Sequence, residues 1–459
     1  MSAKSAVASV TWEDLPKVAN DVIQQALAAG ATDAECTISE GDEFSANVRM
    51  GELETLKDAG SRGAGLRVLI GKRMGASYTS DLTPEGIRHM VQSAIDLAGV
   101  TTEDPHAGLP DASELGSIGV DLGLFSNDTA SLPTEERIAM AKRAEAAALA
   151  LDPRITNSEG ASFDSSVGGR VFANSRGFAG SYRTSYCSVS AVPVATKDGS
   201  MERDYWYTMA RNYKGLDDPE AVGRKAAERA LRRLGAVKVE TQRVPVIFEP
   251  RTARSLLSNI FEAVDGRAIY KHASFLTGKL GEKIADERIT VIDDGTIPGL
   301  FGSSPFDDEG VPTRRTPVIE RGVLKNYLLN SYTARKLNMK TTGNASRGVT
   351  GNAGIGHGNF FLEAGPRTPE EIIRSVKNGF YVTELIGSGV NIVTGDYSRG
   401  AVGIWIKDGE LAFPVSEVTI ASTLQEMLNG IGEIGSDLEF LSSVSAPTIM
   451  LGEMTVAGR

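Results

Sequence analysis

Glycine residues punctuate this sequence more often than any other turn-forming residue. There are 50 of them in 459 residues, well above average usage, and no collagen-like period accompanies them. They lie between short runs in which apolar and polar residues alternate, which is typical of strands joined by tight turns. Segments with helical periodicity lie among these runs, but a regular strand–helix alternation does not dominate. The sequence therefore predicts an α+β fold.

The length of the chain predicts two domains, because one hydrophobic core rarely extends over 459 residues. We place the boundary near residues 235–242, where a helix ends and a new apolar strand begins. Residues 1–240 are expected to form an α+β domain with a mixed or antiparallel sheet and packed helices. Residues 241–459 are expected to form a mostly antiparallel β domain with short helices.

The expected elements follow from periodicity and from capping residues. Helices are predicted at 12–29, 83–97, 132–151, 219–234, 250–264, 331–338, 367–377 and 422–430. Strands are predicted at 33–40, 43–49, 52–58, 63–79, 244–248, 288–293, 316–320, 322–328, 379–385, 390–394, 401–407 and 410–413.

Two glycine-rich segments in the N-terminal half resemble each other. They read Gly-Ser-Arg-Gly at 60–63 and Asn-Ser-Arg-Gly at 174–177, and each lies between expected strands. Since a helix precedes and follows each unit, they indicate a possible internal duplication. A chance similarity of two turns explains them equally well.

Charge and composition narrow the class of protein. The net charge of −11 argues against a nucleic-acid-binding surface. Only two cysteines occur, Cys36 and Cys187, so we expect a reducing cytoplasm rather than a secreted disulfide scaffold. No signal-peptide pattern and no run of about 18 apolar residues is visible, so no membrane association is expected.

Histidine spacing does not predict a zinc site. The four histidines are His89, His106, His272 and His357, and none lies within five residues of another. Zinc hydrolases commonly place two histidines one helical turn apart. The sequence also lacks a serine-hydrolase elbow and a phosphate-binding loop.

Acidic residues form the first candidate site. Asp294 follows a predicted strand, and Asp307, Asp308 and Glu309 follow shortly after it. Such carboxylates can bind Mg²⁺ or Ca²⁺ or act as acid and base, although Asp side chains also cap their own turns. Glu262, on the helix at 250–264, either lines a cleft or belongs to a solvated helix face.

Two further segments are candidates for ligand contact. Asp396, Ser398 and Arg399 lie in a glycine-rich stretch, where an acid and an arginine can bind the two ends of a peptide or brace a bend by pairing with each other. The segment 343–358 is rich in glycine, asparagine and serine. It is either a ligand-facing loop or a flexible connection.

Ordered motifs over residues 250–459 resemble the TldD/PmbA family, whose members have been described as modulators of DNA gyrase and classed as metalloproteases. The matching segments are VIDDG at 291–295, PFDDEGV at 305–311, GVLKNYLL at 322–329, SYTARKL at 331–337, TGDYSRG at 394–400 and PVSEVTIA at 414–421. The N-terminal half resembles the family in layout more than in residues.

The resemblance also indicates a branch of the family. The TldD branch carries His-Glu-x-x-x-His on a helix and a cysteine near the C-terminus, and these residues hold a metal. The corresponding segments here are Leu256 to Gly266, without histidine, and Ser442 to Ala446, without cysteine. This departure is characteristic of the PmbA branch, also called TldE.

The resemblance implies a subunit of a cytoplasmic peptidase complex that acts on flexible peptides or small unfolded proteins. No cofactor is expected in this chain, and zinc is expected in a TldD-type partner, with which the chain forms a heterodimer; alone it forms a homodimer. A sheet edge in the C-terminal domain would accept an extended peptide. Asp396 and Arg399 would then hold the peptide or meet the partner.

Two other functions remain open from the sequence. One is a stand-alone hydrolase with a carboxylate-based metal site at Asp294, Asp307, Asp308 or Glu309. The other is a non-catalytic regulatory binding protein linked to gyrase-poison or toxin systems.

Overall fold

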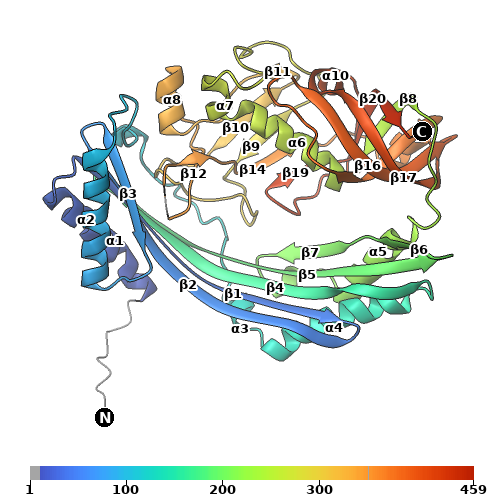
Figure 1. Ribbon diagram of the computed structural model, residues 1–459, viewed down its shortest axis with the longest axis horizontal. Coiled ribbons are helices and arrows are strands. Elements are labelled where there is room, and N and C mark those ends of the chain that lie inside the picture. The colour runs from blue at the N-terminus through green and yellow to red at the C-terminus, as the bar shows by residue number, and fades with distance from the viewer. Residues whose placement is uncertain (1–10, 350, 459) are drawn as a thin grey trace.

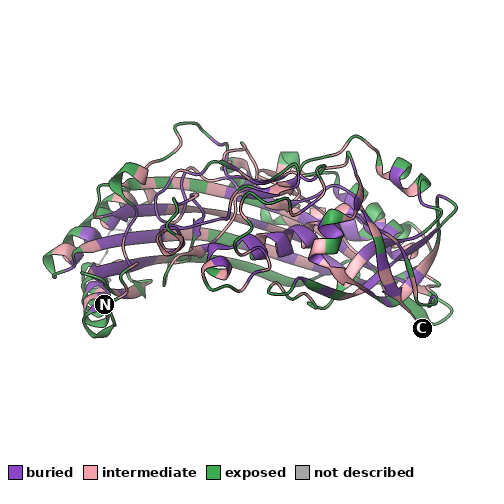
Figure 2. Cartoon of the chain, turned by 90° about the horizontal axis from the view of Figure 1, so that it is seen from above, coloured by how far each residue is buried: buried purple, intermediate pink, exposed green. Residues whose placement is uncertain are grey.

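A computed structural model describes residues 11–349 and 351–458 of the chain. It has two halves, a long curved sheet with helices on its outer side and a second body of strands and short helices that lies over the inner side of the curve (Figure 1). Much of the long sheet is buried, whereas the outer faces of its helices are exposed (Figure 2). The predicted α+β class is confirmed.

The long sheet is antiparallel throughout. Its strands lie in the order β3-β2-β1-β4-β5-β6, and β7 also pairs with β5. The strands are β1 (Asp33–Arg49), β2 (Glu52–Ile70), β3 (Arg73–Thr79), β4 (Ile155–Asn174), β5 (Ala179–Lys197), β6 (Ser200–Arg203) and β7 (Trp206–Ala210).

Helices cover one face of this sheet at both of its ends. They are α1 (Leu15–Ala28), α2 (Pro84–Val100), α3 (Asn127–Ser131), α4 (Thr134–Ala150) and α5 (Pro219–Leu231). Even-numbered residues of β1 face them, since Cys36 packs with α1 and α2 and Phe44 packs with α4. Strand alternation places odd-numbered residues such as Glu35 on the opposite face, toward the C-terminal half.

The structure corrects two details of the N-terminal prediction. β1 and β2 run without the expected breaks, because glycine here serves close strand pairing; a Cβ at Gly168 would lie 2.7 Å from the carbonyl oxygen of Glu40 on β1. Residues 60–63 lie inside β2, whereas residues 174–177 form a true turn with Gly177 at φ +91°. The two segments therefore do not form equivalent turns, and their similarity does not support a duplication. The strand order is nevertheless symmetric about the β1–β4 pair.

The C-terminal half contains two main sheets. Its elements are β8 (Gln242–Phe248), α6 (Pro250–Val264), α7 (Gly266–Tyr270), β9 (Val291–Asp294), β10 (Arg315–Glu320), β11 (Val323–Leu324), α8 (Ser331–Leu337), β12 (Ala345–Ser346), β13 (Gly354–Ile355), β14 (Asn359–Leu362), α9 (Pro369–Arg374), β15 (Asn378–Ile386), β16 (Asp396–Lys407), β17 (Glu410–Thr423), α10 (Leu424–Asn429), β18 (Ile431–Ile434), β19 (Val444–Ser445) and β20 (Ile449–Ala457).

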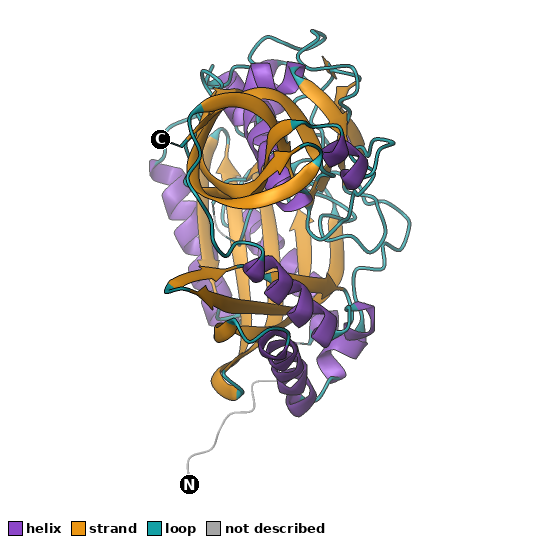
Figure 3. Cartoon of the chain, turned by 90° about the vertical axis from the view of Figure 1, so that its right-hand side faces the viewer, coloured by secondary structure: helices purple, strands orange, loops and turns teal. Residues whose placement is uncertain are grey.

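One of these sheets closes on itself. Its order is β17-β16-β15-β8-β20-β18, and an additional β17–β20 pairing joins the two sides into a ring (Figure 3). The other sheet has the order β11-β10-β9-β14-β19. α6 packs between the two sheets, where Leu256, Leu257 and Ile260 are buried in the largest core.

Two predictions fail around the glycine-rich stretch. Residues 390–394 form no strand, and only an isolated bridge joins Val390 to Tyr397. Residues 396–400 were expected in a bend or loop, but they begin β16 of the closed sheet. Their alternating burial, with Tyr397 inside and Asp396 and Ser398 outside, is that of an ordinary strand.

No helix among the described residues is long and apolar enough to cross a membrane.

Candidate functional site

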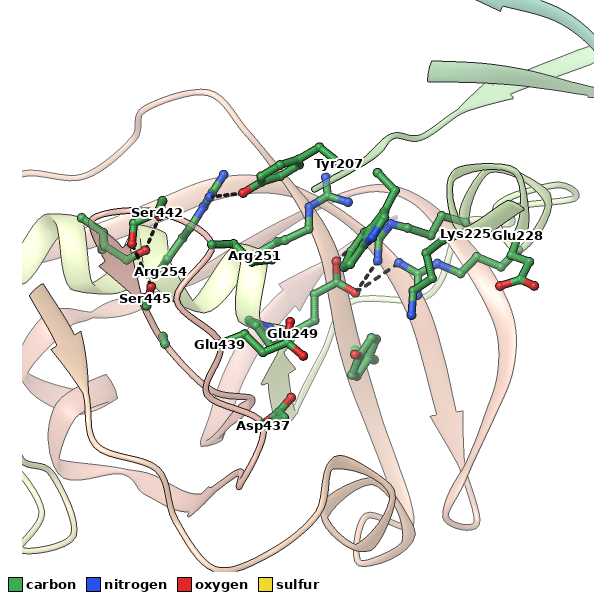
Figure 4. Close-up of a pocket in the computed structure, with 18 residues that line it drawn as sticks. Tyr207, Lys225, Glu228, Glu249, Arg251, Arg254, Asp437, Glu439, Ser442 and Ser445 are labelled. Carbon is green, nitrogen blue, oxygen red and sulfur yellow. Dashed lines mark hydrogen bonds and ion pairs between the residues drawn. The ribbon is translucent and has the colours of Figure 1, made fainter. Parts of the chain in front are cut away.

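A cavity of about 420 Å³ lies where the two halves meet. The N-terminal half contributes β7 and α5, and the C-terminal half contributes the first turn of α6 and the segment 437–446 (Figure 4). The residues that line it include Trp206, Tyr207, Lys225, Glu228, Arg229, Arg232, Glu249, Arg251, Arg254, Tyr381, Asp437, Glu439, Ser442 and Ser445.

Two buried carboxylates organise the cationic side of this cavity. Asp204 pairs with Arg229 and Arg251, each at 3.2 Å. Glu249 pairs with Arg229 at 2.5 Å and with Arg232 at 3.1 Å. Burial alone would raise the pKa of Asp204, but the charges of Arg229 and Arg251 hold the pKa below its usual value. This network of ion pairs joins α5 to α6 across the two halves.

Two cations at the cavity are not used by this network. Arg254 donates to the Tyr207 hydroxyl at 3.2 Å, and Lys225 lies 5.0 Å from the centre of the Trp206 ring. Within residues 11–349 and 351–458, neither side chain has a carboxylate at ion-pair distance. Figure 4 shows Arg254 beside Tyr207 at the end of the cavity that Ser442 and Ser445 border. A guanidinium in this position can bind a ligand carboxylate.

One of the two segments in which the family resemblance locates metal ligands, Ser442 to Ala446, lines this cavity, whereas the α6 residues that line it precede the other segment, Leu256 to Gly266. β19, at 444–445, packs against α6, and Ser442 and Ser445 line the cavity together with Arg251 and Arg254. The Ser442 hydroxyl donates to the carbonyl oxygen of Val444 at 2.5 Å. Arginine and serine side chains do not fit zinc, which takes imidazole, thiolate or carboxylate ligands. In the described part of the chain, no group of three or more His, Cys, Asp or Glu residues has a metal-binding arrangement.

The acidic candidates do not converge on one point. Asp307 and Asp308 line a small second cavity of about 140 Å³ with Asp293, but Asp294 and Glu309 do not line it. Asp294 accepts from the backbone N–H of Thr296 at 2.8 Å, and Asp307 accepts from those of Glu309 and Val311 at 2.9 and 3.0 Å. In these bonds the Asp side chains cap their own turns, which was the alternative to metal binding or acid–base chemistry.

Three aspartates instead fix the segment 343–358. Asp307 accepts from the backbone N–H of Ala345 at 2.9 Å, Asp308 from that of Arg347 at 2.7 Å, and Asp293 from that of Gly358 at 2.7 Å. The described residues of this segment are therefore anchored, contrary to the expectation of a flexible connection.

The anchored segment also ties the two halves together. The Arg347 guanidinium pairs with buried Glu35 on the inner face of β1. β12 extends from the C-terminal body toward the long sheet (Figure 1).

Burial leaves two of these aspartates with raised pKa values. Burial raises the pKa of Asp293 to about 7, although Asn344 and the backbone of Gly358 donate to it. Burial, followed by the nearby charge of Glu309, raises the pKa of Asp307 to about 8. Among the described residues, neither Asp293 nor Asp307 has a cation at ion-pair distance, in contrast to Asp204.

The remaining predicted site residues lie away from the 420 Å³ cavity. Asp396 and Ser398 are exposed on one face of β16, and Arg399, three residues from Asp396, points to the other face. In the described structure no ion pair joins Asp396 and Arg399; Asp396 accepts from the Thr394 hydroxyl at 2.5 Å. Glu262 is exposed on α6.

Sequence reasoning missed the arginine-lined cavity. Lys225 and Arg229 are one helical turn apart on α5, and Arg251 and Arg254 are three residues apart on α6. That spacing was the available signal, but a basic helix stripe is usually solvated. The carboxylates that pair with these residues are distant in sequence, so only the fold shows the network.

Family models match most of the chain. The C-terminal domain model described as PmbA/TldA metallopeptidase matches residues 241–458, the central domain model matches 127–234, and the domain 1 model matches 34–98. Among curated relatives, metalloprotease PmbA of Escherichia coli O157:H7 is 39% identical over 446 residues, covering 96% of this chain and 97% of that protein. A TldD homologue of Haemophilus influenzae is 25% identical over 425 residues, covering 86% and 87%.

Solved structures share the fold over nearly the whole length. A Bacteroides thetaiotaomicron protein named as a candidate modulator of DNA gyrase superposes with a TM-score of 0.91 at 28% identity, covering 98% of this chain and all of that chain. TldE from Thermococcus kodakarensis superposes with a TM-score of 0.88 at 23% identity, covering 96% of this chain and all of that chain.

Proposed function

The chain belongs to the PmbA/TldD metallopeptidase family, and we propose that it is the subunit without metal ligands in a two-subunit cytoplasmic peptidase. Its metal-bearing partner is a TldD-type chain, which supplies zinc. Its substrates are flexible peptides or small unfolded proteins.

One observation carries this proposal. The two segments that correspond to the metal-holding ones of the TldD branch belong to α6 and the region of β19, which pack together, and the cavity beside this contact is lined by Arg251, Arg254, Ser442 and Ser445. Cations at these positions repel a metal ion and attract a carboxylate. The cavity is therefore suited to binding a substrate, and the hydrolytic step falls to another subunit.

The geometry also supports a peptide ligand. Arg254 and Lys225 are available to bind a carboxylate, either a peptide C-terminus or an acidic side chain. β19 is an edge strand whose recorded strand partner is β14, and Ser445 of β19 lines the cavity. An extended segment that adds there would gain main-chain hydrogen bonds with little dependence on sequence. In the closed sheet, in contrast, part of β17 is already paired with β20.

Metal analysis together with co-purification tests the assignment. The purified chain is expected to hold no stoichiometric zinc and to co-purify from its native cell with a paralogue that carries His-Glu-x-x-x-His. Tightly held zinc in the isolated chain would contradict the assignment.

The two alternative functions find less support. A stand-alone hydrolase that uses Asp294, Asp307, Asp308 or Glu309 needs open carboxylate oxygens, but backbone N–H groups already occupy Asp294 and Asp307. Peptide cleavage by the isolated chain that is lost on Asp307→Ala would favour it. A non-catalytic regulatory role would be favoured if peptides remain intact even with the TldD-type partner present.

A further inference from the structure

A second cavity between the two halves, of about 520 Å³, is lined by several cations. It lies between the β2–β3 turn and residues 101–108 on one side and α7, α8 and residues 352–354 on the other, remote from the cavity in Figure 4. Its cationic lining residues are Arg67, Lys72, Arg267 and Arg335, and its acidic ones are Asp104 and Glu309.

Two of these cations are held on one short stretch of backbone. The Lys72 ammonium donates to the carbonyl oxygen of Ala107 at 2.7 Å. The Arg335 guanidinium donates to the carbonyl oxygens of His106, Gly108 and Leu109 at 2.7, 3.0 and 3.2 Å. Because both bind neighbouring carbonyls, their charges lie close together.

These two charges are not neutralised within the protein. Carbonyl oxygens are neutral, and among the described residues neither Lys72 nor Arg335 has a carboxylate at ion-pair distance. Burial lowers the pKa of Arg335, and the charge of Glu309, which acts in the opposite direction, does not cancel this shift. Asp104, another acidic lining group, is shared by the Tyr332 hydroxyl and by Lys336.

Arg67, a third cation that lines the cavity, has a hydrogen-bond donor without a partner in the described structure. Arg67 is 8% exposed and pairs with Glu35 through Nε at 2.5 Å, but its Nη2 has no hydrogen-bond partner. Glu35 is shared with Arg347, so one carboxylate faces two guanidinium groups. An excess of positive charge and an unpartnered donor therefore meet at the same cavity.

Two tyrosines complete the lining. Tyr270 and Tyr332 line the cavity with their ring centres 6.2 Å apart in an edge-to-face arrangement. The hydrogen bond from Tyr332 to Asp104, at 2.8 Å, fixes the second ring. The cavity thus combines cations that suit an anion with aromatic rings that suit an organic group.

We propose that this cavity binds a small organic phosphate of nucleotide size, with its phosphate between Lys72, Arg335 and Arg67 and its organic group against Tyr270 and Tyr332. A compact dianion matches the two unneutralised charges better than a neutral molecule does. The volume accommodates a mononucleotide together with several water molecules.

Calorimetric titration of the full-length chain with AMP, adenosine and inorganic phosphate tests the proposal. AMP is expected to bind more tightly than inorganic phosphate, and adenosine is expected to show no measurable binding. Lys72→Gln should weaken AMP binding about tenfold, the factor expected for losing one charged hydrogen bond. Tyr270→Ala should weaken binding of AMP but leave that of inorganic phosphate unchanged.

Lys279→Gln serves as the matched control, because Lys279 is an exposed lysine that pairs with Glu282 and does not line the cavity. It should leave AMP binding unchanged. The proposal is overturned if AMP does not bind, if adenosine binds as well as AMP, or if Lys72→Gln and Lys279→Gln have equal effects. Circular dichroism of each variant separates lost binding from lost folding. If Lys72→Gln does not fold, the Tyr270→Ala result decides.

Discussion

Two groups of buried carboxylates link the halves of this molecule, and they are compensated in opposite ways. Asp204 and Glu249 are surrounded by arginines, whose charges hold the pKa of Asp204 below its usual value. Asp293 and Asp307 are met by amide N–H groups, and burial raises their pKa values. The first arrangement leaves surplus cations at a cavity, whereas the second fixes a segment of backbone. Carboxylate clusters alone therefore do not identify the site; their partners do.

The largest effect is expected from removing the charge of Asp204. Asp204→Asn removes a buried carboxylate that pairs with Arg229 and Arg251. The free energy of unfolding should therefore fall by about 3–5 kcal/mol. Urea denaturation measures the loss. Glu220→Gln is the control, because its ion pair with Arg143 is largely exposed and should be worth less than about 1 kcal/mol. Equal losses for the two variants would remove the distinction between the buried network and a surface pair.

The next effect separates the two arginines of α6. Arg254→Gln should weaken binding of a peptide carboxylate about tenfold with little loss of stability, because in the described structure the Arg254 side chain has only the Tyr207 hydroxyl as a hydrogen-bond partner. Arg251→Gln should instead lower stability, since Arg251 pairs with Asp204. Fluorescence anisotropy with a labelled peptide, compared with its C-terminally amidated form, measures the binding. Equal affinity of wild type for the two peptides would show that no carboxylate is recognised.

Asp293, one of the two carboxylates whose pKa values are raised by burial, predicts a pH dependence of stability. Because folding raises the pKa of Asp293 from 3.8 to about 7, its contribution to stability is complete below pH 3.8 and is lost as the pH rises through 7. The fall in Tm between about pH 5 and about pH 8, which lie on either side of the folded-state pKa, should be smaller in Asp293→Asn than in wild type. Asp21→Asn, at an exposed position on α1, should retain the wild-type difference. An unchanged difference in Asp293→Asn would show that Asp293 is ionised at both pH values.

The smallest effects are expected at the exposed candidates. Asp396→Asn and Glu262→Gln should each change the free energy of unfolding by no more than about 0.5 kcal/mol, because both side chains are exposed and neither has an ion-pair partner in the described structure. Thermal denaturation of the isolated chain measures this. If either variant is as damaging as Asp204→Asn, the exposed residue has a role that these contacts do not explain.

Much of the fold followed from local signals. Thr83 and Pro84 predicted the start of α2, and the Thr83 hydroxyl caps the helix at Gly86 as expected. The predictions fail where a glycine is required by a contact with residues distant in sequence. Gly41 and Gly168 are opposed in neighbouring strands, and Gly395 directly precedes β16 whereas Gly400 lies inside it. Local patterns do not distinguish a glycine that turns the chain from one that admits a neighbour.

The site was less predictable than the fold. Asp307 and Asp308 were found as a motif, but their role as anchors for Ala345 and Arg347 depends on a contact with a segment almost 40 residues away. Asp204 and Arg251 are 47 positions apart and lie in different halves. Such pairs carry no local signature, because each residue taken alone resembles a solvated surface charge.

Reconstitution of peptide cleavage tests the central claim most directly. The purified chain, a TldD-type subunit from the same cell, and an equimolar mixture of the two are each incubated with an unfolded small protein, and the products are followed by mass spectrometry. We predict cleavage by the mixture, none by this chain alone, and slower cleavage by a mixture containing Arg254→Gln. Full cleavage by this chain alone, or none by the mixture, would contradict the account.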